Sequence, residues 1–497
     1  MNAPVTDVII VGAGPTGLML AGELRLGGVE VTVLDRLAEP MKQSRALGFS
    51  ARTIEEFGQR GLLPRFGELQ TIPIGHFGGL PLDYRVLEGG SYGARGKPQS
   101  LTESILADWA TGLGARLQRE HEVVGLNADD DGADVTVVSP AGRSRLRARY
   151  VVGCDGGRST IRRLAGIGFP GTDPVIEMWL ADVAGCELRP RFSGERVPGG
   201  MVMVLPMGPT VNRVVVYERD AEPGQGPPAF TDVAKAWQRL TGEDIHGGTP
   251  LWVSWFTDSS RQASEYRRDR VFVAGDAAHV HMPIGGQGMS AGIQDAVNLG
   301  WKLAAAIRGW AADGLLDSYH RERHPVGRRV LANTLAQRIV YLGGDEMDPL
   351  RSVLAELLAY PDVQRHLVGM VTGLDIRYDV GCDHPLAGRR LPAVELVTAN
   401  GEPATTSTFE PLQGARGVLF DLADSDLADG ARLKDAAAGW ADRVQVITAA
   451  PRPGSPLDDV AALLVRPDGY IAWASRPGQG ADGLPEAFAR WFGRPAT

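Results

Sequence analysis

Apolar residues near the start of the chain fall into two short runs separated by a glycine turn and an amphipathic stretch. Val8 to Val11 is a continuous apolar run, as in a strand buried on both faces, and Val29 to Leu34 is rich in Val and predicts a second strand. Leu18 to Leu26 has helical spacing and is stopped by Gly27-Gly28. This order predicts a β–α–β unit with parallel strands.

Two more buried strands are predicted far along the chain, at Tyr150–Gly153 and Arg270–Gly275, and an aspartate follows each of them. Between them, from about 176 to 264, the pattern changes to short runs rich in Val, Met and Tyr, as in 201–205 and 213–217. Runs of this kind predict the strands of an antiparallel sheet, inserted into the first domain.

The remaining pattern predicts helices at 231–240, 293–308 and 321–340, and then a final segment that mixes strands and helices. We therefore expect an α/β protein with three parts. They are a discontinuous first domain (1–175 and 265–385), a β-sheet domain (176–264, with a contribution from about 73–100) and a C-terminal domain (386–497).

Composition excludes several functions. The 497 residues have a net charge of −9, which argues against nucleic acid as a partner. The three cysteines form no C-x-x-C and are too few for a disulfide framework, so no zinc or dithiol site is expected. The N-terminal apolar run is too short for a signal peptide or a membrane span, and we expect a cytoplasmic protein without membrane contact.

The first turn, Gly12-Ala13-Gly14-Pro15-Thr16-Gly17, is a G-x-G-x-x-G sequence between a strand and a helix. Gly12 permits the sharp turn, Gly14 lets the backbone approach a pyrophosphate, and Gly17 permits close helix–strand packing. Asp35 ends the second strand, where a carboxylate accepts hydrogen bonds from a ribose. These features predict dinucleotide binding but do not separate NAD from FAD.

The two later aspartate sequences favour a flavin. Gly153–Ser159 and Gly275–His279 both follow strands, and the second continues into a glycine-rich stretch, 283–290, that opens a helix. Backbone N–H groups presented there suit the N1–C2=O edge of a flavin, where negative charge accumulates on reduction. Asp276 is placed to bind ribityl hydroxyls. His279 and His281 have no third ligand at a useful spacing, so we expect no metal.

Together, in this order, the three motifs resemble the para-hydroxybenzoate hydroxylase family of FAD-dependent monooxygenases. The segments 21–25, 59–61, 75–80 and 319–327 are more closely similar to aromatic polyketide hydroxylases of the angucycline type. The resemblance implies a Rossmann-like FAD-binding domain with an inserted antiparallel-β substrate domain. It also implies a thioredoxin-like C-terminal domain, here without C-x-x-C.

The resemblance assigns FAD contacts position by position. Arg45 would approach the pyrophosphate and NADPH, Gln99 the ribityl and phosphate, and Val123 the adenine through its backbone. Asp35 stands where relatives usually have Glu, and Ser290 where many have Asn. The cofactor residues assigned in this way are Gly12, Gly14, Pro15, Thr16, Gly17, Asp35, Arg36, Arg45, Gln99, Val123, Asp155, Thr160, Asp276, Gly288, Met289 and Ser290.

The implied reaction is NADPH- and O2-dependent hydroxylation of a polycyclic aromatic polyketide through a flavin C4a-hydroperoxide, in antibiotic biosynthesis. The backbone carbonyl of Pro283 would orient the hydroperoxide. Substrate walls are expected at Phe77, Met203 and Trp252, with Trp179, Met201 and Leu205 as further candidates. No general base has a spacing argument behind it, and either a monomer or a homodimer is compatible with the sequence.

Alternatives remain open at this point. A Baeyer–Villiger or other oxygenation of a related polyketide can use the same scaffold, and so can a non-catalytic FAD-binding protein. A flavin halogenase would show W-x-W-x-I-P, which is absent around Trp252 and Trp255. A plain NAD dehydrogenase would not need the two later aspartate motifs.

Overall fold

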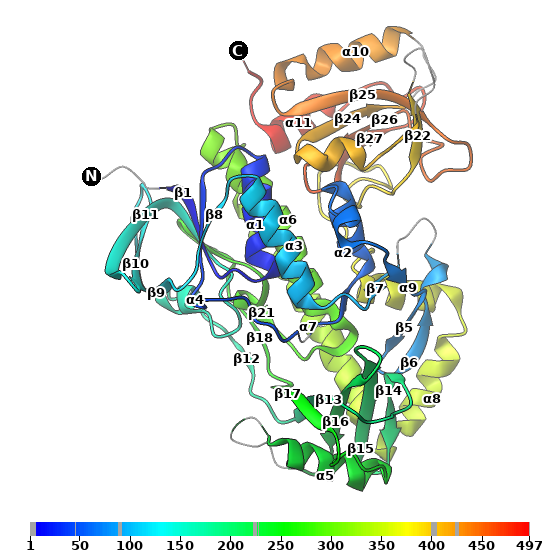
Figure 1. Ribbon diagram of the computed structural model, residues 1–497. Coiled ribbons are helices and arrows are strands. Elements are labelled where there is room, and N and C mark those ends of the chain that lie inside the picture. Colours follow the sequence, from blue (N-terminus) through cyan, green and yellow to red (C-terminus); the bar gives the residue numbers. More distant parts are fainter. Residues whose placement is uncertain are drawn as a thin grey trace.

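The structure is a computed structural model that describes residues 6–496, apart from 45, 88–91, 222–225, 227, 399–404 and 423–426. Figure 1 shows three regions: a nucleotide-binding region in the middle, a green sheet at one end, and the orange and red C-terminal segment at the other. The long helix α7 (Asp317–Leu342) runs from the middle region toward the green sheet (Figure 1).

The central sheet has the order β19-β20-β11-β1-β2-β8, and all neighbours from β20 to β8 are parallel. An antiparallel pair, β9 and β10, extends from β11. The strands are β1 (Thr6–Val11), β2 (Val31–Leu34), β8 (Arg116–Gln118), β9 (Glu122–Ala128), β10 (Ala133–Ser139), β11 (Gly142–Gly153), β19 (Arg267–Arg268) and β20 (Val271–Val273).

Three helices pack together against this sheet: α1 (Pro15–Leu26), α3 (Gln99–Gly112) and α6 (Gln287–Arg308). Glycine makes the contact between α1 and α3 close, because a Cβ on Gly22 would stand 2.0 Å from the ring of Trp109. The apolar runs of the sequence therefore form strands with both faces covered, as expected for a parallel sheet. Helix α6 begins six residues before the predicted 293, because its first turn is glycine- and serine-rich and lacks an apolar period.

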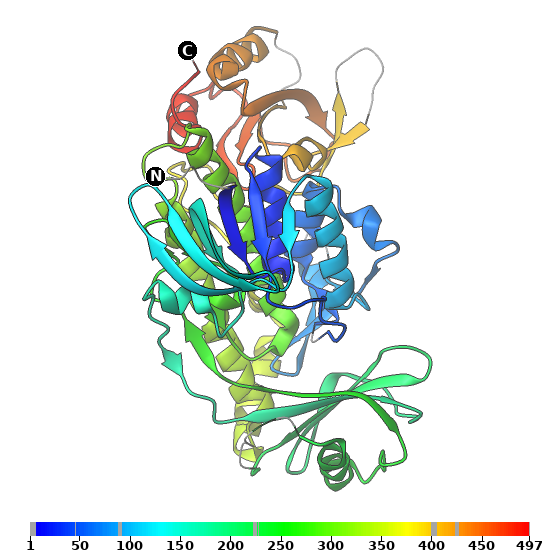
Figure 2. The same cartoon turned by 60° about the vertical axis from the view of Figure 1, so that its left-hand side comes forward.

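The second sheet is antiparallel, in the order β14-β15-β16-β13-β17, and lies within 176–264. Its alternating residues divide between two faces. Val202, Val204 and Val214 pack under helix α5 (Phe230–Thr241), whereas Met201 and Tyr217 face the nucleotide-binding region. The strands are β13 (Glu177–Ala184), β14 (Arg191–Val197), β15 (Gly200–Pro206), β16 (Val211–Glu218) and β17 (Thr249–Thr257). Figure 2 shows this sheet, in green, below the central sheet.

Shorter elements connect these regions. The β5–β6 hairpin (Ile74–Phe77, Leu80–Asp83) packs on α9. The remaining connecting elements are β3 (Gly48–Phe49), α2 (Ala51–Gln59), β4 (Gln70–Thr71), β7 (Ala94–Arg95), α4 (Thr160–Leu164), β12 (Gly171–Thr172), β18 (Ser260–Gln262), β21 (His279–Val280), α8 (Asp348–Leu357) and α9 (Pro361–Thr372).

The C-terminal region has a mixed sheet in the order β23-β22-β25-β24-β26-β27, with a β24–α10–β25 crossover and the closing helix α11. This is the thioredoxin-like arrangement expected from the sequence. Its elements are β22 (Glu395–Thr398), β23 (Thr405–Ser407), β24 (Gly417–Asp421), α10 (Leu427–Ala437), β25 (Val444–Pro451), β26 (Ala462–Val465), β27 (Ile471–Ser475) and α11 (Leu484–Phe492).

Buried ion pairs attach the C-terminal region to the rest. Arg466 makes two hydrogen bonds to Glu322 of α7, at 2.6 and 2.8 Å, and Lys302 of α6 lies 2.8 Å from the same carboxylate. Burial lowers the pKa of Lys302 to about 8. Since breaking one partner of such a network leaves an unpaired buried charge, the interface holds the two regions in one arrangement.

The domain boundaries named above stay a prediction. The segment 222–228, which is rich in Pro and Gly, lies mostly outside the described residues. Within the described part of the chain, no helix combines the length and apolarity that crossing a membrane requires.

Candidate functional site

The carboxyl ends of four parallel strands meet at one edge of the central sheet. Val11 pairs in register with both Leu34 and Gly153, and Gly153 pairs with Val273. The turn that follows each strand therefore begins at the same level. This edge is where ligands bind in open parallel sheets.

The first turn is built as its sequence predicted. Gly12 has φ +106°, and a Cβ there would stand 2.3 Å from the carbonyl oxygen of Cys154. A Cβ on Gly17 would stand 2.1 Å from the carbonyl oxygen of Gly12. Around Gly14, in contrast, a Cβ would meet nothing within 4 Å. The chain leaves space only beside the glycine expected at the pyrophosphate.

Thr16 joins this turn to the third motif. A Cβ on Gly275 would lie 2.6 Å from Thr16 Oγ1, and one on Gly292 of α6 would lie 2.3 Å from the same atom. Pro15 occupies the first position of α1, whose N-terminus has neither a side-chain cap nor an acidic residue in its first turn. Its backbone N–H groups are therefore free to bind an anion.

Asp35 is bound within the fold. Its Oδ2 accepts from the Ala13 backbone N–H at 2.7 Å and its Oδ1 from the Leu37 N–H at 2.8 Å. The carboxylate thus fixes the first turn against the end of β2. Arg36, which follows it, is exposed.

Arg45 lies outside the described residues. Gln99 is the first residue of α3 and donates its side-chain amide to Glu103 at 2.7 Å. Its backbone N–H donates to the carbonyl of Ala46 at 3.0 Å, and Ser44 hydrogen-bonds Ser100. Ser44 and Ala46 therefore contact the start of α3.

Val123 lies on β9, which pairs with β10 alone. Its side chain is buried with Val11 and Leu34 of the central sheet. The side chain belongs to the core, and the residue as a whole is buried. Contact of its backbone with adenine stays a prediction.

The carboxylate of Asp155 accepts hydrogen bonds at the start of α4. Its Oδ2 accepts from the backbone N–H groups of Thr160 and Ile161, at 2.7 and 3.1 Å, and its Oδ1 accepts from Ser159 Oγ at 2.5 Å. The Thr160 hydroxyl accepts from Arg163 at 3.1 Å on the surface. Both residues stabilise the turn that follows β11.

Asp276 differs. It lies in a short 3-10 segment, Gly275–Ala277, and is exposed although both neighbours are buried. Among the described residues its carboxylate has no hydrogen-bond partner. The fold thus presents a free carboxylate beside the first turn.

The stretch before α6 is open and contorted. Gly285 and Gly286 are exposed with φ +72° and +65°, and the Pro283 carbonyl accepts from the Gly286 N–H at 3.2 Å. Gly288 and Met289 are half-buried in the uncapped first turn of α6. Ser290 is buried, and its hydroxyl accepts from the Ser50 N–H at 3.1 Å.

A buried network that sequence reasoning missed supports the third motif. Asp295 of α6 accepts from the Gly275 N–H at 3.1 Å, lies 2.8 Å from His279 Nε2, and pairs with Arg323 at 2.7 Å. Burial alone would raise the pKa of Asp295, but Arg323 and His279 hold it below its usual value. The sequence signal for this network was Asp295 itself, an acidic residue in the middle of a helix among apolar positions.

His281 lies beside the same motif. Burial lowers the pKa of its ring, and the neutral ring donates from Nδ1 to the Met282 carbonyl at 2.8 Å. One ring nitrogen of each histidine therefore has a partner inside the fold, whereas His279 Nδ1 and His281 Nε2 are buried without a hydrogen-bond partner among the described residues.

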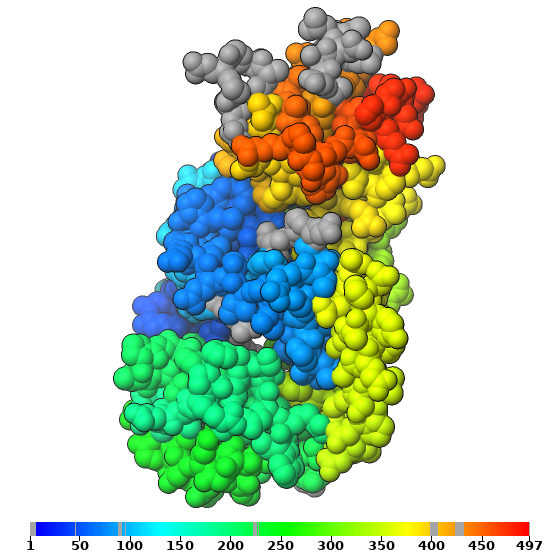
Figure 3. All heavy atoms as spheres, turned by 90° about the vertical axis from the view of Figure 1, so that its right-hand side faces the viewer, coloured from blue at the N-terminus to red at the C-terminus, as the bar shows by residue number. Residues whose placement is uncertain are grey.

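The face of the second sheet that looks toward the site is mostly apolar, but it also carries the Arg213–Asp182 ion pair, with Arg213 over the ring of Trp252. Met203 and Trp252 border a cluster that contains Met282 and Ile284, the residues on either side of Pro283. Trp179 lies on the opposite face under α5. Phe77 packs in a separate cluster with α9. In Figure 3 a hollow separates the green surface of this sheet from the blue surface above it.

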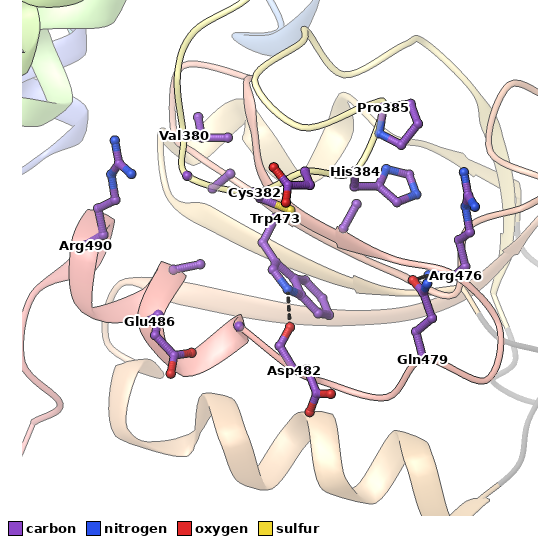
Figure 4. A pocket seen from close by; sticks show the side chains of 16 residues that line it. Val380, Cys382, His384, Pro385, Trp473, Arg476, Gln479, Asp482, Glu486 and Arg490 are labelled. Atoms are coloured by element: carbon purple, nitrogen blue, oxygen red, sulfur yellow. Dashed lines mark hydrogen bonds between the residues drawn. The ribbon is translucent and has the colours of Figure 1, made fainter.

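A separate hollow of about 570 Å³ lies on the C-terminal region (Figure 4). Trp473 and His384 line it, and Trp473 donates to the Asp482 carbonyl at 2.8 Å. None of the residues assigned to FAD borders it. It is therefore not part of the nucleotide site.

The residues at the sheet edge fit FAD. The space beside Gly14, the two uncapped helix N-termini and the free Asp276 carboxylate supply room, N–H donors for a pyrophosphate and for a flavin edge, and an acceptor for hydroxyls.

Comparison with known proteins gives two family matches. The model of the FAD binding domain matches residues 5–334, and that of the aromatic-ring hydroxylase C-terminal domain matches 384–495. The 12-dehydrotetracycline 5-monooxygenase/anhydrotetracycline 6-monooxygenase of Streptomyces rimosus is 44% identical over 99% of both chains. A rifampicin monooxygenase of Streptomyces venezuelae is also 44% identical, over 98% of both.

Among solved structures, CabE, an aromatic hydroxylase from angucycline biosynthesis, superimposes with a TM-score of 0.93. It is 57% identical, and 99% of each chain is covered. The two monooxygenases above act on different molecules at equal identity, so identity alone does not select a substrate.

Proposed function

The chain belongs to the FAD-binding family of aromatic-ring hydroxylases, and on this premise we propose that it hydroxylates a polycyclic aromatic polyketide of the angucycline type in antibiotic biosynthesis, using NADPH and O2. FAD, when bound and reduced by NADPH, supplies the activation of oxygen. The chain's own residues bind the cofactor, orient the substrate and exclude water.

One observation carries the proposal: the first and third turns touch each other, the space beside Gly14 is open, and Asp276 is exposed. These are the positions at which the resemblance places the pyrophosphate and the ribityl chain. An elongated cofactor that passes between them reaches the first turn of α6, next to Met282 and Ile284.

The substrate position follows from that path. A ring system lying against the first turn of α6 faces the apolar side of the second sheet, where Met203 and Trp252 are half-buried. Thioether and indole side chains suit a flat, apolar, aromatic ligand. Dry walls also protect an activated oxygen species from water. The pairing of CabE with angucycline biosynthesis supports the same substrate class.

The test is substrate-stimulated NADPH oxidation. Purified protein is loaded with FAD and mixed with NADPH and a set of tetracyclic polyketide intermediates, and products are identified by mass spectrometry. We expect faster NADPH consumption and a product heavier by one oxygen atom whose new group is a phenol. An ester or lactone product would favour Baeyer–Villiger oxygenation instead. Unchanged NADPH consumption with every compound would support a non-catalytic FAD-binding protein.

A further inference from the structure

A chain of buried amide groups runs from the β5–β6 hairpin through α7 to the first residue of α6 (Figure 1). The Gly78 backbone N–H donates to Gln337 Oε1 at 3.1 Å. Gln337 Nε2 donates to Asn333 Oδ1 at 3.0 Å, and Asn333 Nδ2 donates to Gln287 Oε1 at 3.1 Å. The three side-chain residues are 0%, 4% and 5% exposed.

This series of amide hydrogen bonds has a fixed direction from donor to acceptor. Amide oxygen and nitrogen are assigned from their hydrogen-bond partners, and here the first partner settles the assignment. A backbone N–H is only a donor, so Gln337 must turn its oxygen toward Gly78 and its nitrogen toward Asn333. The same reasoning then turns the nitrogen of Asn333 toward Gln287. Gln287 Oε1 therefore faces Asn333, and Gln287 Nε2 faces away from the hydrogen-bonded series.

The outer end has no partner. Gln287 Nε2 is buried and makes no hydrogen bond among the described residues. Gly285 lies against it: a Cβ on that exposed glycine would stand 3.3 Å from Nε2. A buried donor without an acceptor is unfavourable, so a ligand that supplies one gains from it.

The surroundings restrict the acceptor. Gln287 opens the helix whose first turn faces the proposed flavin, and the adjoining Met282 and Ile284 face the substrate sheet. A neutral amide in an apolar setting suits a neutral acceptor, whereas an anion is usually met by Arg or Lys. The isoalloxazine ring carries carbonyl oxygens, and a polycyclic aromatic polyketide that bears a quinone carries them too.

We propose that Gln287 Nε2 donates a hydrogen bond to a ring carbonyl bound at the start of α6, and that Asn333 and Gln337 are positioning residues that keep this donor facing outward. The proposal rests on the proposed function, because the carbonyl belongs either to FAD or to the aromatic substrate. Gly285 must shift slightly for the contact, and its left-handed backbone leaves no side chain in the way.

Two variants remove the outward donor in different ways. Gln287→Leu deletes it without adding charge. Asn333→Asp flips the side-chain amide of Gln287 without changing that residue. The new carboxylate accepts from both Gln337 and Gln287, so Gln287 must turn its oxygen away from it. The two donated hydrogen bonds favour the ionised carboxylate and burial opposes it, so the titrations are made at about pH 8. Gln238→Leu, at an exposed glutamine of α5, is the matched control.

Each protein is freed of flavin and titrated with FAD by fluorescence, and the FAD-loaded form is then titrated with 1,8-dihydroxyanthraquinone by absorbance. Thermal unfolding monitors folding. We expect both variants, but not the control, to weaken one of the two affinities. Gln287→Leu should lose about threefold to tenfold, and Asn333→Asp at least about tenfold, because its outward oxygen repels a carbonyl. Loss in the first titration assigns the carbonyl to FAD, and loss in the second to the substrate.

Unchanged affinities in both variants would overturn the proposal. A loss in Gln287→Leu without one in Asn333→Asp would overturn the positioning role of the chain. Failure of the unsubstituted protein to bind FAD at all would instead reject the proposed function, so the two failures are distinguishable.

Discussion

Asp155 and Asp276 look equivalent in the sequence, since each follows a buried parallel strand and lies beside glycine. In the structure they differ. Asp155 accepts three hydrogen bonds from the chain that follows it, whereas Asp276 is exposed and accepts none among the described residues. Asp155 therefore stabilises the fold, whereas the exposed carboxylate of Asp276 is available to a ligand. A sequence motif therefore locates a carboxylate, but only its hydrogen-bond partners distinguish a structural carboxylate from a ligand-binding one.

The glycines of the first turn repeat this contrast. Gly12 and Gly17 face backbone oxygens at 2.3 and 2.1 Å from a would-be Cβ, while Gly14 faces open space. Two of these glycines are required by the fold, and the third is required only if something binds beside it. The predictions below test whether closed positions control stability and open positions control FAD binding.

The largest effect on FAD binding is expected for Gly14→Val. Gly14 has φ −79° and ψ 179°, an extended backbone that any residue adopts, so folding should be almost unaffected. The isopropyl group would occupy the place of the pyrophosphate. We expect FAD affinity to fall more than about 100-fold, measured by titration of flavin-free protein, with a similar melting temperature. Normal flavin content after purification would contradict this placement.

Gly12→Ala is the matched closed-position variant. Its backbone has φ +106° and its Cβ would collide with Cys154, so the variant should lose stability by several kcal/mol. A well-folded Gly12→Ala protein would remove the distinction between the two glycines.

Asp276→Asn should have the next largest effect on FAD. An amide keeps the shape of the side chain but loses the charged acceptor, and hydrogen bonds to charged groups contribute about 1.5–3 kcal/mol. FAD affinity should therefore fall about tenfold to 100-fold, with little change in thermal unfolding because no protein group loses a partner. Destabilisation of the flavin-free protein would show that Asp276 is structural after all.

Asp155→Ala should show the opposite pattern. The variant loses the carboxylate that accepts from the first two backbone N–H groups of α4, although Ser159 remains the N-cap, and losing a partner of this kind typically costs about 0.5–2 kcal/mol. Chemical denaturation should report that loss, whereas the FAD affinity of the folded protein should change less than about twofold. A loss of affinity as large as that of Asp276→Asn would abolish the contrast between the two aspartates.

Much of this architecture was predictable from the sequence. Short apolar runs predicted parallel strands, short runs rich in Val and Met predicted the second sheet, and the family resemblance and fold class are confirmed. These features depend on local patterns of glycine and apolar residues. The site assignments stay predictions, although the structure shows that Gly14 and Asp276 are open and that Asp35 and Asp155 are bound.

Partners far apart in the sequence were beyond such patterns. Asp295 holds Gly275 across 20 residues, and Gln287 is oriented by Asn333 on another helix. No spacing rule connects these residues, because their contact depends on how α6 and α7 pack. The orientation of a side chain likewise required the fold: Trp179 and Trp252 lie on neighbouring strands but on opposite faces of one sheet.

The smallest effect is expected for Thr160→Ala, which tests a residue that the resemblance assigned to FAD. Its backbone N–H, unchanged by the substitution, binds Asp155, and its hydroxyl meets Arg163 on the surface. We expect less than about 0.5 kcal/mol in stability and less than about twofold in FAD affinity. Loss of tenfold or more in the FAD titration would return Thr160 to the cofactor site. It would also mean that a residue of the turn after β11 can be hydrogen-bonded within the protein and still contact FAD. Hydrogen bonds within the protein would then not be sufficient to identify a structural residue.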